Sequence, residues 1–136
     1  MTATKPPKLR GINHIHLSVP DKLVAAKWYE EMLGFRIVES MLSWNTTTGP
    51  LTIEDESGRI HLALFASDNY TPTSAVAFDA SGEAFLLWKS YLEAARLLQR
   101  CSNHKLSWSL YFNDPFGHSL EITSGDTEVI NQVLAA

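Results

Sequence analysis

The side chains that could hold a metal ion or move a proton are few in this chain of 136 residues. It contains five histidines and one cysteine. His14 and His16 are separated by one residue, His61 stands among apolar residues, and Glu121 lies between a leucine and an isoleucine. A carboxylate in such surroundings is costly unless it is paired, coordinated or solvated. Glu121 is therefore either a functional carboxylate, as a metal ligand or general base, or one half of an internal ion pair.

Alternation along two strand-like stretches places these groups on one face of a sheet. In residues 11–19, Ile15, Leu17 and Val19 share one face, and His14 and His16 lie on the other, with Ile12 and Ser18. In residues 118–123 the leucine and isoleucine claim the packed face, which turns Glu121 to the opposite side. We expect the apolar faces to meet helices and the polar faces to line a cavity.

The elements that position these faces repeat once along the chain. Asp21 is suited to begin a helix as its N-cap and Gly34 to end it, while Asp126 is suited to begin a short terminal helix that turns Val129, Ile130, Val133 and Leu134 inward. The other expected elements are strands at 35–44, 51–55, 59–65, 74–79, 108–112 and 118–123, and a helix at about 83–98. The order predicts an α+β fold of two β-α-β-β-β modules that form an open, barrel-like mixed sheet around a shared cavity, with the helices outside.

Composition excludes several classes of function. The formal net charge is −4 and no cluster of Lys and Arg occurs, which argues against nucleic-acid binding. No run of about 18 apolar residues predicts a membrane span. The lone Cys101 cannot form an internal disulfide and is expected to be an inert thiol. With no signal peptide pattern at the start, we expect a cytoplasmic protein.

Two stretches resemble the vicinal oxygen chelate superfamily, which includes glyoxalase I, extradiol dioxygenases, fosfomycin-resistance transferases and bleomycin-resistance proteins. The first is Ile-Asn-His-Ile-His-Leu at 12–17, followed by Lys-Trp-Tyr-Glu-Glu-Met-Leu-Gly-Phe at 27–35. The second, at 109–122, contains the pattern Asp-Pro-x-Gly-x-x-x-Glu that ends at Glu121. The resemblance implies a glyoxalase-like domain at 9–124, with modules at about 9–67 and 74–124. The residues outside it predict a flexible tail at 1–8, which contains two prolines, and a short helix at 125–136.

The resemblance implies a divalent metal ion, with zinc, iron, manganese and nickel all open, that acts as a Lewis acid on neighbouring oxygens of a small organic substrate. His14 stands at the ligand position of the first strand and Glu121 at that of the last. Ala63 and Ala75 stand at the two other ligand positions, so the metal site is incomplete and the ion is either held by a reduced set or absent.

His61 lies two residues before Ala63 on the same face, and with His14 and Glu121 it would form a set of two histidines and one carboxylate. A shift of two residues along a strand moves a ligand by roughly 6.6 Å, however, against a metal–nitrogen bond of about 2.1 Å. The other expected pocket residues are His16, Ala63, Ala75, Tyr111 and Ser119. We also expect Trp44 to flank the cavity mouth, and His104 and His118 to lie at the surface.

Three functions remain open from these observations. The first is a metal-assisted lyase, isomerase or dioxygenase with an incomplete metal site. The second is a metal-free protein of the bleomycin-resistance kind that binds and sequesters a ligand. The third is an interaction module without a ligand. The resemblance also implies a homodimer.

Overall fold

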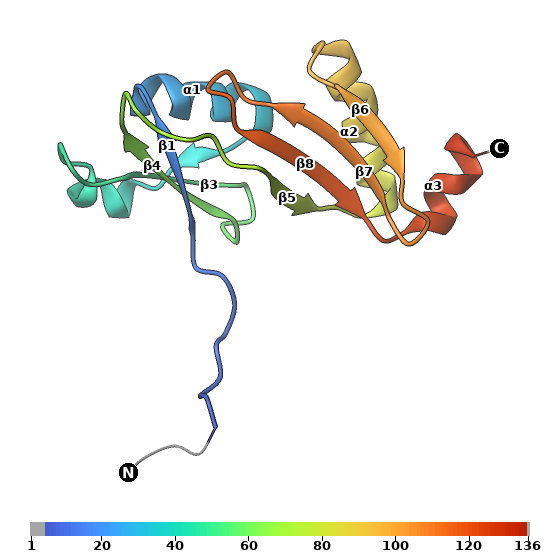
Figure 1. Cartoon of the computed structure of the whole chain (residues 1–136), viewed down its shortest axis with the longest axis horizontal. Coiled ribbons are helices and arrows are strands. Elements are labelled where there is room, and N and C mark those ends of the chain that lie inside the picture. Colours follow the sequence, from blue (N-terminus) through green and yellow to red (C-terminus); the bar gives the residue numbers. More distant parts are fainter. Residues whose placement is uncertain (1–4, 136) are drawn as a thin grey trace. The chain divides into compact units, whose positions relative to one another are not determined.

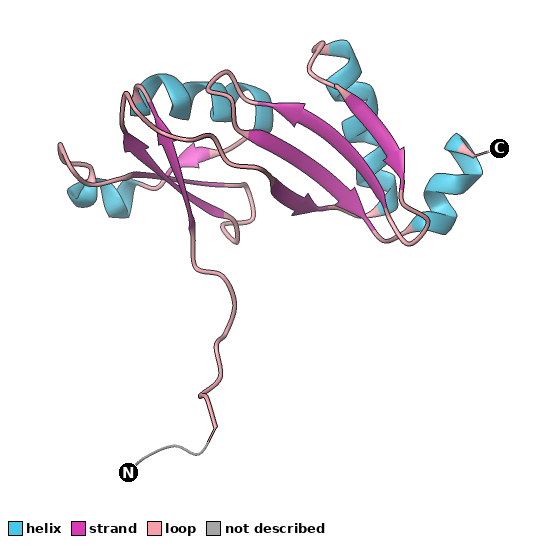
Figure 2. Ribbon diagram, viewed as in Figure 1, coloured by secondary structure: helices cyan, strands magenta, loops and turns pink. Residues whose placement is uncertain are grey.

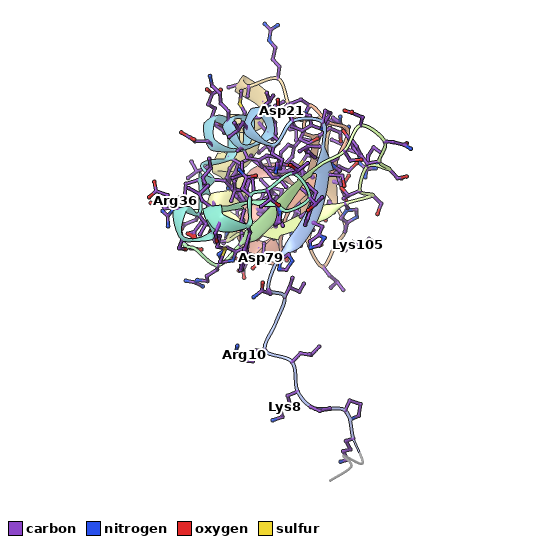
Figure 3. The ribbon with its side chains drawn as sticks, turned by 90° about the vertical axis from the view of Figure 1, so that its left-hand side faces the viewer. Lys8, Arg10, Asp21, Arg36, Asp79 and Lys105 are labelled. Atoms are coloured by element: carbon purple, nitrogen blue, oxygen red, sulfur yellow. The ribbon has the colours of Figure 1, made fainter. Side chains whose placement is uncertain are left out.

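The computed structural model describes residues 5–135 in two compact units, the first ending at Tyr70 and the second beginning at Thr71. Residues 1–4 of the expected N-terminal tail, and Ala136, lie outside the described residues. The segment from Lys5 to His14 is extended and leads into the first strand (Figure 1), with Lys8 and Arg10 along it (Figure 3). Each unit contains one four-stranded sheet with helices (Figure 2).

The first unit has a mixed sheet in which one strand pair is parallel and the other two are antiparallel. The strand order is β1-β4-β3-β2, and β1 runs parallel to β4. Helix α1 packs on β2, β3 and β4. Its elements are β1 (Ile15–Val19), α1 (Lys22–Leu33), β2 (Arg36–Ile37), the 3₁₀ helix η1 (Glu39–Trp44), β3 (Leu51–Glu54) and β4 (His61–Ala66).

The second unit repeats this topology. Its strand order is β5-β8-β7-β6, with β5 parallel to β8 and the other pairs antiparallel. Its elements are β5 (Val76–Asp79), α2 (Gly82–Ala94), β6 (Arg100–Asn103), β7 (Trp108–Asn113), β8 (Ser119–Ser124) and α3 (Thr127–Leu134). The predicted α+β class with two β-α-β-β-β units is confirmed.

Helix α1 begins and ends where the sequence predicts. The carboxylate of Asp21 accepts hydrogen bonds from the backbone N–H groups of Leu23 (3.0 Å) and Val24 (3.1 Å). Gly34 follows the last turn with φ of 74°, a left-handed conformation that favours glycine. These two residues fix the length of α1, and with it the apolar face that covers the sheet.

Each unit buries its own apolar face between sheet and helix. On the strands, buried leucines, isoleucines and valines alternate with polar or small residues of the opposite face, as the pattern predicts. The core side chains of the first unit include Leu17, Val19, Tyr29, Leu51, Ile53, Leu62 and Leu64. Those of the second include Val76, Phe85, Leu92, Leu110, Phe112, Leu120, Ile122 and Ile130.

The strand expected at 35–44 is wrong over most of its length. Strand β2 stops at Ile37, and after a last bond from Val38 N–H to the carbonyl of Thr52 the chain turns into η1. The turns are closed by bonds such as Met41 N–H to the carbonyl of Val38 (3.1 Å). Segment 39–44 mixes serine and glutamate with apolar residues, so its alternation did not reveal which local structure it adopts.

The helix expected to reach residue 98 also ends early. Helix α2 stops at Ala94, Arg96 adopts a positive φ of 58°, and Gln99 N–H bonds to the carbonyl of Tyr111. The chain then forms β6, which the sequence analysis did not predict. Residues 96–99 favour a helix by intrinsic propensity, but pairing with β7 outweighs that local preference.

The terminal helix differs from expectation in two ways. In α3 only Ile130 is buried, whereas Val129 and Val133 are 38% and 61% exposed. Asp126 makes no side-chain cap on α3. Its Oδ2 instead accepts a 2.8 Å hydrogen bond from Gly82 N–H at the start of α2. A Cβ at Gly82 would lie only 2.9 Å from the Cβ of Asp126, so α2 and α3 approach too closely there for a larger residue.

Candidate functional site

The first unit contains a cavity of about 260 Å³ on the sheet face opposite α1. One of its lining residues is Ala63 of β4, which pairs with His16 of β1 on one side and Thr52 of β3 on the other, and both of these partners also line the cavity. Since alanine carries only a methyl group, these larger neighbours stand around a hollow. The residues that line it are Asn13, His14, His16, Met41, Trp44, Pro50, Thr52, His61, Ala63 and Phe65.

His14 and His16 form a linked pair on one side of this cavity. Their Nε2 atoms lie 2.9 Å apart, and their rings are inclined by only 19° with centroids 4.9 Å apart. His14 Nδ1 lies 2.7 Å from Asn13 Oδ1. The ring of His16 also contacts that of Phe65, at 4.6 Å between centroids. Both imidazoles are exposed at the cavity and each is oriented by a neighbour.

His61 lines the same cavity but is engaged by an acidic residue. Its Nε2 lies 3.6 Å from Oε1 of Glu54, its register partner on β3. The other oxygen of Glu54 accepts a 3.0 Å hydrogen bond from Arg36 of β2. Arg36, Glu54 and His61 therefore form a row of polar side chains across β2, β3 and β4, and this row orients the His61 ring.

The rim of the cavity is held by backbone contacts. Lys22 of α1 donates from Nζ to the carbonyl oxygens of Thr46 (2.8 Å) and Gly49 (3.1 Å). Gly49 N–H in turn donates to the hydroxyl of Thr46, and a Cβ at Gly49 would overlap the carbonyl oxygen of Trp44. These contacts fix the loop that carries Trp44, whose side chain remains 58% exposed beside the cavity.

Glu121 lies on the equivalent face of the second sheet. Ser109 of β7 donates a 2.8 Å hydrogen bond to its Oε2 and also lies 3.2 Å from the hydroxyl of Thr123. In register, Glu121 sits between Ala77 and Tyr111. Within the described part of this unit, the contact is a hydrogen bond to a neutral hydroxyl and not the internal ion pair considered from the sequence.

Tyr111, one of the expected pocket residues, is the register partner of Glu121 and shares its face of the sheet. Its hydroxyl lies 2.9 Å from Nε2 of His104, and the guanidinium carbon of Arg100 lies 4.3 Å from the centre of its ring. His104 is exposed as expected. Ser119 lies on β8 two residues before Glu121, and Ala75 directly precedes β5.

The expectation that His118 lies at the surface is wrong. Its side chain is 1% exposed, and Nδ1 accepts a 3.0 Å hydrogen bond from Thr73 N–H. The side chain of Asp114 accepts from the N–H groups of Phe116 and His118, both at 2.9 Å. Asp114 and His118 are therefore buried at the two ends of the Asp-Pro-x-Gly turn, whereas Pro115 and Gly117 between them are exposed. The composition of this segment is typical of an exposed turn, which is why the sequence analysis missed this.

Cys101 on β6 is half-buried. Burial raises the pKa of its thiol above the ordinary value, with the nearby Lys89 acting in the opposite direction. A raised thiol pKa lowers the fraction of nucleophilic thiolate at neutral pH. This supports the expectation of an inert thiol.

Comparison with known proteins decides the family. The model of the Glyoxalase/Bleomycin resistance protein/Dioxygenase superfamily matches residues 11–122. The chain belongs to this superfamily. It is 28% identical over 127 residues to the metallothiol transferase FosB of Staphylococcus epidermidis, covering 87% of this chain and 84% of FosB. The resemblance seen in the sequence motifs is confirmed.

Two solved structures show the same fold. A mutant of the fosfomycin resistance protein FosX from Listeria monocytogenes, in complex with Mn(II) and 1S,2S-dihydroxypropylphosphonic acid, matches with a TM-score of 0.70 and 16% identity, covering 90% of this chain and 97% of FosX. Lactoylglutathione lyase from Agrobacterium tumefaciens matches with a TM-score of 0.69 and 23% identity, covering 90% and 98%. No helix in the described part of this chain is long and apolar enough to span a membrane.

The ligand positions are known for this chain only from the resemblance of its sequence to the superfamily. The positions that the resemblance assigns to two of four ligands carry the methyl groups of Ala63 and Ala75, which donate no electron pair. Among residues 5–135, no group of three or more His, Cys, Asp and Glu side chains is arranged to hold an ion. A catalytic metal site commonly uses three protein ligands and an open position. The donor chemistry therefore fits a reduced site or none.

Proposed function

We propose that this superfamily member binds a small organic molecule in the cavity of its first unit. The observation that carries the proposal is the hollow over Ala63, between the pair of imidazoles on one side and the fixed rim with Trp44 on the other. Ligand pockets are concave, largely apolar and supplied with a few placed polar groups. This cavity has that composition, because Met41, Trp44 and Phe65 are its large apolar residues.

The dimensions favour a compact, flat ligand. The volume of about 260 Å³ lies just below the range of about 300–1,000 Å³ that is usual for ligand pockets. One or two fused rings would fill it and could stack on the indole of Trp44. His14, His16 and Thr52 can exchange hydrogen bonds with hydroxyl or carbonyl oxygens. The proposed ligand class is thus a planar organic molecule that carries such oxygens.

A thermal-shift titration with planar hydroxylated aromatic compounds, in EDTA, tests this proposal. A ligand that binds only the folded protein raises its midpoint, and we expect Trp44→Ala to abolish that rise. Leu42→Ala is the matched control, because Leu42 is 46% exposed on the same helix η1 but does not line the cavity. If no compound of the class shifts the wild-type protein, or if Trp44→Ala keeps the full shift, the proposed ligand site is wrong.

A second candidate function is metal-assisted catalysis as a lyase, isomerase or dioxygenase. Glu121, His14 and His61 are then the candidate ligands, Glu121 also the general base, and Zn, Fe, Mn or Ni the candidate ion. The hydrogen bond from Ser109, which holds the half-buried Glu121 in place, favours this candidate. The alanines at two ligand positions favour the metal-free alternative, a sequestering protein of the bleomycin-resistance kind. Metal content after purification without chelators, compared with that of Glu121→Gln, separates the two.

We further propose that the protein acts as a homodimer in the cytoplasm. Residues 9–124 would form the glyoxalase-like domain in this proposal, with residues 1–8 as a tail and residues 125–136 near the dimer contact. The resemblance to the superfamily supports the dimer. A truncation after Gly125 that leaves the molecular mass in solution unchanged would contradict a role of the terminal helix in the contact.

A further inference from the structure

Residues 5–12 form an extended arm that precedes β1, and every residue in it is exposed (Figure 1). Leu9 and Ile12 are 92% and 81% exposed, although apolar side chains gain free energy from burial. Gly11 has a φ of 149°, which other residues rarely adopt, so the direction of the arm depends on this glycine. The arm is therefore placed to contact another molecule.

The charge of the arm is opposite to that of the rest of the chain. Lys5, Lys8 and Arg10 are three of the chain's 11 Lys and Arg residues, and none of its 15 Asp and Glu residues precedes Asp21. Figure 3 shows the side chains of Lys8 and Arg10 along the arm, away from the folded elements. Since the whole chain has a net charge of −4, the part after the arm is more acidic still. Charge and apolar side chains together favour an acidic surface with exposed apolar residues.

The β2 edge of the first sheet offers such a surface. The guanidinium of Arg36 lies 3.0 Å from the carboxylate of Glu54 and offsets its charge. Glu30 and Glu39 are both exposed and leave the surface with a net negative charge. Between them lie the partly exposed side chains of Ile37 and Val38. These residues line a groove of about 530 Å³, which consists of Glu30, Arg36, Ile37, Val38, Glu39 and Glu54.

Strand β2 also presents backbone hydrogen-bonding groups at this edge. It is the last strand in the order β1-β4-β3-β2 and pairs with β3 on its inner side. Val38 N–H bonds inward to the carbonyl of Thr52. Because bonding alternates along an antiparallel pair, the N–H and C=O of the preceding residue, Ile37, point away from β3. An extended segment can add to such an edge as a further strand.

We infer that the arm of one copy lies along β2 of a second copy, whose own arm does the same in return. The basic side chains of the arm then lie beside Glu30 and Glu39, and Leu9 packs on Ile37 and Val38. Such a reciprocal contact closes at two copies. A second copy is favoured over the arm's own sheet, because the arm precedes β1 at the opposite edge from β2 and leads away from that sheet (Figure 1).

The inference rests on the proposed homodimer and specifies one of its contacts. This contact lies in the first unit, whereas the truncation after Gly125 tests a contact of the second unit. It is also separate from the proposed ligand site, because the groove and the cavity beside Trp44 share no lining residue. The ligand titration in EDTA therefore tests a different surface.

An exchange of charge between two full-length variants tests the contact. Lys8→Glu/Arg10→Glu makes the arm acidic, and Glu30→Lys/Glu39→Lys makes the groove basic. In analytical ultracentrifugation, each variant alone should have a dimer dissociation constant roughly tenfold or more above that of the wild type, since like charges then meet. An equimolar mixture should form a heterodimer within about threefold of the wild-type constant, because both arms then meet grooves of opposite charge.

Glu56→Lys/Glu128→Lys is the matched control, because both residues are exposed and neither lines the groove. It should dimerise like the wild type and should not restore association of the acidic-arm variant. Circular dichroism spectra of all variants should match the wild type, which separates loss of the contact from loss of the fold. The wild-type dissociation constant should also rise with salt concentration, since salt screens exposed charges.

The possible outcomes separate the arm contact from the dimer itself. If both charge variants dimerise like the wild type, or if their mixture forms no heterodimer, the arm contact is wrong and the homodimer stands. Docking of the arm on its own chain would give that second result. A wild-type dimer that is insensitive to salt would also contradict the contact. If the wild type is monomeric, both proposals are wrong.

Discussion

The two units share one backbone plan but present different chemistry on equivalent sheet faces. In both, the first strand runs parallel to the last, which lies second in the strand order. The first unit has imidazoles, aromatic residues and a hollow over Ala63. The second has hydroxyl groups around Glu121, with Arg100 stacked on Tyr111. The repeated topology therefore supplies a frame, and the side chains on the polar face decide what each unit can bind.

The connection after each helix accounts for part of this difference. In the first unit, β2 has two residues and the chain turns into η1, whose Met41 and Trp44 form the cavity rim. In the second unit, the equivalent β6 has four residues that pair along β7. Pairing directs Arg100 to the position beside Tyr111. A change of local structure over a few residues thus gives the first unit a rim of η1 side chains and the second unit a longer strand that pairs with β7.

The largest effect on stability is expected from two matched substitutions, each of which creates a cavity in the core of one unit. Leu62 on β4 and Leu120 on β8 are both 0% exposed on the second strand of their sheets. Each substitution to alanine should lower the free energy of unfolding by about 2–5 kcal/mol. Urea unfolding measures the loss of unfolding free energy, and hydrogen exchange shows which unit loses protection of its backbone amides. Protection should fall mainly in the substituted unit. An equal loss in both units would contradict two separate cores.

Two glycine substitutions should have the next largest effect. Gly49→Ala forces the rim loop away from Trp44, and Gly82→Ala forces α3 away from α2. Each should cost about 1–3 kcal/mol of unfolding free energy through overpacking. Only Gly49→Ala should also reduce the ligand-induced thermal shift. Gly125→Ala is the control, because a Cβ there meets nothing within 4 Å. If the ligand-induced thermal shift of Gly49→Ala equals that of the wild type, the rim loop does not contribute to ligand binding.

Much of this frame could be predicted from local signals. The Asp21 cap, the Gly34 end and the alternation around Glu121 are each set by neighbouring residues, and the structure confirms all three. Strand β6 and η1 could not be predicted in the same way. Strand β6 depends on pairing with β7, and η1 on contact with β3; both partners come later in the chain, so propensity within the segment did not reveal either structure.

In the candidate site, too, the features set by neighbouring residues could be predicted, and those set by contacts between side chains could not. Alternation placed His14 and His16 on one face, yet it contained no information on the Nε2 contact between them or on the role of Asn13. His118 was assigned by its turn composition, whereas its burial depends on Thr73, 45 residues away. That His14 and Glu121 serve one site stays a prediction. Side-chain contacts between distant segments are thus the part that the sequence pattern could not supply.

The helix caps offer a smaller test of the same comparison. Helix α1 is capped by one side chain, the carboxylate of Asp21. Helix α2 is capped by two side chains: the Ser81 hydroxyl accepts a hydrogen bond from Ala84 N–H, and the Asp126 carboxylate accepts one from Gly82 N–H. Asp21→Ala should cost about 1 kcal/mol of unfolding free energy, and Ser81→Ala about 0.5 kcal/mol because the second cap remains. Urea unfolding of Ser81→Ala/Asp126→Ala should then show a loss like that of Asp21→Ala. A Ser81→Ala loss as large as that of the double variant would show that Asp126 contributes nothing.

The smallest effect concerns Asp55 in the β3–β4 turn, whose counterpart in the β7–β8 turn of the second unit is the buried Asp114. Burial alone would raise the pKa of Asp55, but hydrogen bonds from Ile60 N–H, the Ser57 hydroxyl and Arg59 N–H outweigh it, and the pKa lies below the ordinary value of 3.8. Asp55 binds its proton more weakly when folded than when unfolded. Its contribution to stability is therefore present above pH 3.8 and declines as the pH falls through the lower folded pKa. The stability difference between wild type and Asp55→Asn, measured by urea unfolding from neutral to acidic pH, should shrink over that window. A difference that stays constant or grows as the pH falls would show that these donors do not stabilise the carboxylate.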